Sequence, residues 1–233
     1  MIVNSLIMLS DIPGYVSLLF GLTVIAAILW FYFVLRSRLV LGLLICWAIL
    51  QSILALSGTY LDVQSMPPKM ILFGIGPTVI LMVYLFSTKT GRMFIESLNL
   101  KTLTYFHTIR IPVEGVLALL FHHRAVSVLM TYEGTNFDLF SGLTAPVVAY
   151  LCFRSGSVKT KLLLSWNIIC LLLLLNVLIT SALATPFPFQ MLSLDQPNVA
   201  ILYFPFNLLP TVVVPLVLFS HLVAIYKLTR KKG

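Results

Sequence analysis

The feature that most constrains this chain is a series of long apolar runs separated by short polar breaks. Of its 233 residues, 60% are hydrophobic and only 9% are charged, a composition that excludes a fold surrounded by water. A hydrocarbon core about 30 Å thick is crossed by roughly 20 residues of helix. Seven runs approach this length and are expected to be membrane-spanning helices: 13–35, 39–56, 70–86, 102–121, 137–153, 162–183 and 200–226.

These runs predict an all-α polytopic bundle. They are continuously apolar, whereas the strands of a membrane barrel would alternate apolar and polar residues over about ten positions. The connections between them are short, so we expect residues 1–233 to form a single integral membrane domain.

The basic residues predict the orientation of this bundle. Of the fifteen lysines and arginines, twelve fall in alternate connections or in the tail, where Lys and Arg are typical of the cytoplasmic side. Seven spans with the N-terminus outside and the C-terminus inside fit this pattern, and membrane lipids rather than nucleic acid are the expected partners. The twelve are Arg36, Arg38, Lys89, Arg92, Lys101, Arg154, Lys159, Lys161, Lys227, Arg230, Lys231 and Lys232, while the acids Asp11, Asp62, Glu133, Asp138 and Asp195 fall on the other side.

Prolines recur inside the expected helices. Each removes one backbone N–H and leaves a carbonyl that, inside a membrane, needs a partner from a neighbouring helix or from water. Kinked helices with such substitute hydrogen bonds are therefore expected at Pro77, Pro112, Pro146, Pro205, Pro210 and Pro215.

The fourth expected helix carries three ionisable residues at helical spacing. His107, Arg110 and Glu114 share one face, and Arg110 and Glu114 lie on either side of mid-membrane. A central charged residue costs roughly 2.5 to 3.5 kcal/mol to insert, so this face is expected to point inward. Arg110 and Glu114 are expected to pair directly, either as a structural ion pair or as part of a ligand or proton site.

A second polar cluster follows at the outer end of that helix. His122, His123, Glu133 and Asp138 are a candidate divalent-metal site, although adjacent histidines on one helix diverge by about 100°. The alternative is a structured loop in which Asn136 or Asp138 caps the fifth helix. Because that helix is short, the loop is expected to dip into the bundle, so that Glu133, Asn136 and Asp138 form an outer rim above Glu114.

Isolated polar residues also occur within the apolar runs. They are expected to form interhelical hydrogen bonds rather than a site of their own. These residues are Gln51, Asn167, Asn176, Asn207 and His221.

Three segments carry a resemblance to a protein family. Residues 110–114 (RIPVE), 133–138 (EGTNFD) and 214–221 (VPLVLFSH) resemble uncharacterised seven-helix, multi-pass membrane proteins of Bacteroidota type. The resemblance implies a bacterial inner (cytoplasmic) membrane location and brings no known activity.

Three functions follow as hypotheses. The leading one is binding or transport of a small polar or anionic ligand, or of a proton, at His107, Arg110 and Glu114, with no enzyme activity and no cofactor. The second is a membrane-embedded enzyme with a divalent metal at the outer face. The third is a structural or accessory membrane subunit without chemistry of its own.

Overall fold

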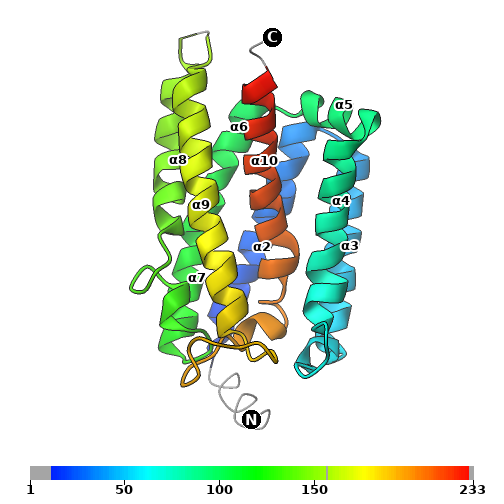
Figure 1. Ribbon diagram of the computed structural model, residues 1–233, viewed down its shortest axis with the longest axis vertical. Coiled ribbons are helices and arrows are strands. Elements are labelled where there is room, and N and C mark those ends of the chain that lie inside the picture. Colours follow the sequence, from blue (N-terminus) through cyan, green and yellow to red (C-terminus); the bar gives the residue numbers. More distant parts are fainter. Residues whose placement is uncertain (1–11, 156, 231–233) are drawn as a thin grey trace.

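The computed structural model describes residues 12–155 and 157–230, so the predictions for Asp11, Lys231 and Lys232 lie outside the described residues. Within these ranges all regular secondary structure is helical, and no strand occurs. The main helices run side by side in an elongated bundle (Figure 1). The predicted all-α class is confirmed.

The bundle is built from long helices joined or interrupted by short irregular ones. The α-helices are α2 (Gly14–Leu35), α3 (Arg38–Leu56), α4 (Gly76–Ser87), α5 (Lys89–Ser97), α6 (Leu100–Phe106), α7 (Arg110–His122), α8 (Asp138–Phe153), α9 (Thr160–Ala184) and α10 (Val214–Arg230). The 3-10 helices are η1 (Thr59–Leu61), η3 (His107–Ile109), η4 (Val128–Met130) and η5 (Ala200–Leu202), and the π-helices are η2 (Ile71–Ile75) and η6 (Leu209–Val213).

Several of these helices are long and apolar enough to cross a membrane. In the described part of the chain four qualify: α2, α3, α9 and the helix Leu209–Arg230. A fifth is present if η2 and α4 are taken with α5, which bends away from α4 by 93°. The chain therefore has the helices of a membrane protein.

Two of the expected helices are interrupted. The fourth tightens into the 3-10 helix η3 just before Pro112, which offers no N–H to the carbonyl of Thr108. The seventh is not continuous from residue 200, as expected, because residues 203–207 are not helical and the long helix runs over Leu209–Arg230. Hydropathy does not register such breaks, since both segments remain apolar.

Helix α3 supplies the hydrogen bonds that two prolines remove from neighbouring helices. The indole N–H of Trp47 donates to the carbonyl of Thr211 over 2.8 Å, and Thr211 lies four residues before Pro215. One turn further along α3, the Gln51 amide donates to the carbonyl of Phe73 over 3.1 Å. Phe73 stands four residues before Pro77 in the same way. The two π-helices, which contain Phe73 and Thr211, are thus held by one face of α3.

Gln51 is the centre of this arrangement. It is fully buried, and its side-chain oxygen accepts from the phenol of Tyr60 while its backbone carbonyl accepts from the amide of Asn207 over 2.9 Å. Burial raises the pKa of Tyr60 in η1 to about 12, which keeps the phenol a hydrogen-bond donor. The interhelical role expected for Gln51 is confirmed, and Asn207 bonds to α3 from the turn that precedes η6.

The connections that carry basic residues lie at one end of the bundle. Helix α5, the loop between α8 and α9, and the end of α10 share this end, while α2 starts at the other (Figure 1). Lys227 of α10 donates to the carbonyls of Glu96 and Leu98, each over 2.7 Å, and so ties α10 to the connection between α5 and α6. This lysine therefore has a structural role within the protein.

Replacing Trp47 by Phe tests the substitute hydrogen bond. We expect Trp47→Phe to lower the free energy of unfolding by about 1 to 3 kcal/mol, because the Thr211 carbonyl loses its donor. The loss should shrink in a Pro215→Ala background, since residue 215 then carries an N–H. Trp30→Phe is the matched control: Trp30 donates to Thr102, and position 106 is not proline. The free energy of unfolding in detergent is measured for Trp47→Phe, Pro215→Ala, their double variant and Trp30→Phe. Equal losses from Trp47→Phe with and without Pro215 would contradict the substitute hydrogen bond.

Candidate functional site

The most unusual feature of the interior is the side chain of Arg110. It is 3% exposed, and its Nη1 atom forms an ion pair with the Asp138 carboxylate over 2.9 Å. Its Nη2 atom lies 3.0 Å from Nε2 of His221 on α10. Arg110 begins α7 and Asp138 begins α8, so this one side chain joins three helices.

The contact with Arg110 fixes the protonation of His221. Because a guanidinium only donates, Nε2 of His221 must accept, and its proton therefore sits on Nδ1. Nδ1 lies 2.9 Å from the side-chain oxygen of Asn167, whose amide group donates to the carbonyl of Leu163 over 2.8 Å. A directed hydrogen-bond chain thus runs, donor to acceptor, from Arg110 through a neutral His221 to Asn167 and the backbone of α9.

His107 stacks on this chain. Its ring lies parallel to that of His221, with 3.9 Å between centroids and 16° between planes. The edge of Trp166 closes the same space, and the Trp166 indole donates to the Thr144 hydroxyl over 2.9 Å. Nδ1 of His107 is buried without a hydrogen-bond partner in the described part of the chain.

Glu114 lies one turn beyond Arg110 and does not pair with it. Its Oε1 atom accepts a hydrogen bond of 2.6 Å from the amide of Asn136, which also donates to the carbonyl of Met130. Its Oε2 atom is buried and has no partner among the described residues. The only hydrogen-bond donor to Glu114 among the described residues is thus the neutral amide of Asn136. Arg110, the nearby cation, is already neutralised by Asp138.

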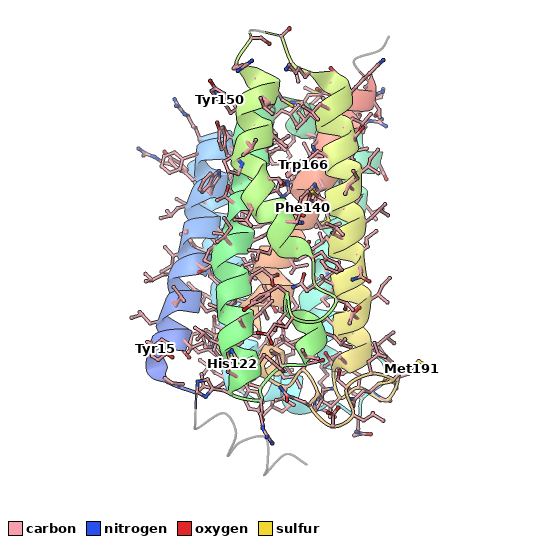
Figure 2. The ribbon with its side chains drawn as sticks, turned by 90° about the vertical axis from the view of Figure 1, so that its left-hand side faces the viewer. Tyr15, His122, Phe140, Tyr150, Trp166 and Met191 are labelled. Carbon is pink, nitrogen blue, oxygen red and sulfur yellow. The ribbon has the colours of Figure 1, made fainter. Side chains whose placement is uncertain are left out.

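The loop before α8 enters the bundle and makes these contacts possible. Figure 2 shows Tyr150 of α8 near one end of the molecule and Phe140 near its middle, so α8 begins inside the bundle. A Cβ atom on Gly142 would lie 3.3 Å from Cβ of Arg110, so glycine allows α8 to pack closely against the start of α7. The Asn136 side chain accepts the N–H of Asp138 over 2.9 Å and caps α8. The expected cap and the expected re-entry of the loop are both confirmed.

A small cavity adjoins the two carboxylates. It has a volume of about 60 Å³ and lies beside the second half of α9, the half that leads to residues 185–199. Polar lining comes from Glu114, Asn136, Asp138 and Ser181, and the rest is apolar. We call Arg110, Asp138, Glu114, His107, His221, Asn136 and Asn167 the buried cluster.

Two expectations about this region need correction. The predicted direct pairing of Arg110 with Glu114 is wrong, because the guanidinium of Arg110 forms its ion pair with Asp138 instead. In the described part of the chain no group of three or more His, Cys, Asp or Glu side chains is placed to hold a metal ion. His122 is exposed at the far end of α7 (Figure 2), whereas Asp138 is buried and pairs with Arg110 at the start of α7, which separates the residues of the expected metal site.

The outer rim is also divided. Asn136 and Asp138 are buried within the cluster, but Glu133 is exposed on the loop, as is His122 at the end of α7, while His123 is partly exposed. The three residues predicted on the fourth helix, His107, Arg110 and Glu114, are all buried and lie within the cluster.

Two members of the cluster were expected only to bond between helices. His221 and Asn167 stand alone in apolar runs, and sequence spacing gives no link between them or to Arg110. In the sequence, only their polarity indicates that they belong to a cluster, because a buried histidine or asparagine in a membrane helix needs a hydrogen-bond partner.

A family model matches residues 67–229, a segment that contains every residue of the buried cluster. The chain belongs to the family of this domain of unknown function, DUF8737. The DUF8737 segment begins after α2 and α3, so the cluster lies wholly in the family's own part of the chain. The chain matches no curated protein and no solved structure.

Paired substitutions identify the counter-ion of Arg110. Arg110→Leu alone should strongly lower the yield and the thermal midpoint, because it leaves Asp138 buried without a counter-ion. Such an unpaired buried charge destabilises the folded state by about 3 to 5 kcal/mol. Arg110→Leu with Asp138→Leu should recover much of this loss. Arg110→Leu with Glu114→Leu is the matched control and should recover none. Fluorescence-detected size exclusion of all three compares them, and recovery by the Glu114 pair alone would contradict the assignment.

Proposed function

We propose that the chain is a seven-span protein of the bacterial inner membrane, with its N-terminus outside and its C-terminus in the cytoplasm. The support is the placement of the basic residues, of which twelve of fifteen fall in the connections and tail at one end of the bundle, as is typical of the cytoplasmic face. In this orientation the small cavity at Glu114 lies toward the outer side, and His221 lies toward the cytoplasmic side.

Within this protein the buried cluster takes up and releases a single proton, and Glu114 is the group that carries it. The observation behind this proposal is a count of charge. Arg110, Glu114 and Asp138 are the buried Lys, Arg, Asp and Glu residues of the described chain. Arg110 and Asp138 neutralise each other, and both histidines are neutral in this scheme. The cluster is therefore neutral with a proton on Glu114 and has one uncompensated negative charge without it.

The size of the cavity supports a proton rather than a larger cargo. Binding pockets for small organic molecules usually have about 300 to 1,000 Å³, whereas this cavity has about 60 Å³, enough for a few waters at most. Water there would give Glu114 a path for proton exchange. The anion-binding role expected for Arg110 is less well supported, because both of its terminal nitrogens are occupied; Arg110 instead holds α7, α8 and α10 together.

A purely structural role is the second candidate. The closed Arg110–Asp138 pair and its link to His221 favour it, since a buried pair of this kind can fix how helices pack. Glu114 distinguishes proton transport from a purely structural role, because the Arg110–Asp138 pair does not need it to hold the helices together. Proton transport requires Glu114, and helix packing does not.

Infrared and flux measurements on Glu114→Gln test the proton site. Wild-type protein should show the carbonyl band of a protonated carboxyl group and should carry protons into liposomes under an imposed potential, read by an enclosed pH dye. Glu114→Gln should lose the band and reduce the flux to that of empty liposomes. Glu133→Gln is the matched control, because Glu133 is an exposed acid on the adjoining loop, and it should keep both. A Glu114→Gln variant with wild-type flux would favour the structural role.

A further inference from the structure

A second hollow lies on the opposite side of α10 from the buried cluster. It has a volume of about 440 Å³ and is lined by α2, α3, α4, α5 and α10, with almost entirely apolar side chains. Phe219 of α10 lines it, and His221 stands two residues further on, about 200° around the helix. We call this hollow the lateral groove; it shares no lining residue with the cavity at Glu114.

The lateral groove is positioned where a lipid tail would be. Three of its walls, α2, α3 and the helix containing α10, are candidate membrane spans. Leu43 and Leu81 line it and are 61% and 55% exposed, so the hollow reaches the apolar outer surface of the bundle. Its volume falls within the range of about 300 to 1,000 Å³ that is usual for small-ligand sites. An occupant at this depth must be apolar.

Three arginines lie on elements that form one end of the lateral groove. Arg36 follows the last residue of α2, the lining residue Leu35, and Arg38 is the first residue of α3, two residues before the lining residue Val40. Among the described residues none of Arg36, Arg38 and Arg92 forms a salt bridge. Guanidinium groups without a carboxylate partner are well suited to a phosphate.

Helix α5 closes this end of the groove and brings the third arginine. It lies across the end of α4 (Figure 1), and its Arg92, about 200° around the helix from the lining residue Phe94, lies at the same end of the bundle as Arg36 and Arg38. A Cβ on Gly91 would lie 2.3 Å from the carbonyl oxygen of Leu85, so only glycine allows α5 to sit this close to α4. With charged and apolar faces, α5 has the pattern of a helix lying in the membrane interface.

We propose that the lateral groove binds one anionic glycerophospholipid, with an acyl chain in the apolar hollow and the phosphate at Arg36, Arg38 and Arg92. The apolar lining accounts for the chain, and the unpaired arginines at the interfacial end account for the charge of the headgroup. This site is independent of the proton site, because α10 separates them.

Native mass spectrometry with two defined lipids tests the proposal. Delipidated protein is mixed with phosphatidylglycerol and phosphatidylcholine of the same chain length. Wild-type protein should bind one phosphatidylglycerol in preference to phosphatidylcholine. The variant Arg36→Gln/Arg38→Gln/Arg92→Gln should lose about fivefold of that preference for each arginine removed. The matched control Arg154→Gln/Lys159→Gln/Lys161→Gln removes three exposed charges from the loop between α8 and α9 and the start of α9, and should keep it.

A steric variant tests the acyl chain separately. Leu44→Trp fills the groove and should weaken both lipids, whereas Leu18→Trp, an exposed position on α2 outside the groove, should weaken neither. Equal binding of the two lipids by wild-type protein overturns the proposal, as does the same loss in the loop control. A lipid-free dimer that Leu44→Trp dissociates would also overturn it and assign the groove to a second copy of the chain.

Discussion

The burial of one guanidinium determines much of this structure. A charge at the centre of an apolar bundle needs a counter-ion at the same depth, and for Arg110 that counter-ion is Asp138. Asp138 reaches it because α8 begins inside the bundle, which in turn requires the preceding loop to enter from the end opposite the basic connections. The polar backbone of that loop is then satisfied within the protein, in part by Asn136, which bonds to Met130 and caps α8.

A second constraint is the satisfaction of backbone carbonyls next to proline. In water such a carbonyl would bind solvent, but in a bundle of this composition it must find a side chain. Trp47 and Gln51 are spaced one turn apart on α3, and each donates to a carbonyl four residues before a proline. The irregular helices η2 and η6 are therefore supported parts of the fold, and η6 lines the lateral groove through Thr211 and Val212.

The sequence predicts the parts of this protein that depend on local patterns and misses those that depend on contacts between helices. Apolar length places most helices within a few residues, and helical spacing correctly puts His107, Arg110 and Glu114 in the interior. The i, i+4 rule wrongly pairs Arg110 with Glu114, because the depth at which α8 begins is set by packing at Gly142. Likewise, nothing in the sequence links Asn167 to His221, since they lie 54 residues apart on different helices, or His221 to the guanidinium of Arg110.

The buried cluster is arranged so that its two acids are linked by one amide. Asn136 donates to Glu114 and accepts the N–H of Asp138, so both hydrogen-bonding ends of its side chain are used. Loss of a proton from Glu114 strengthens the first bond, because an ionised carboxylate is the better acceptor. That change acts on the residue that caps α8 and so on the helix end that carries Asp138. Asp138 holds Arg110, and Arg110 contacts His221 on α10. A change of charge at Glu114 therefore reaches three helices through contacts of 3.0 Å or less.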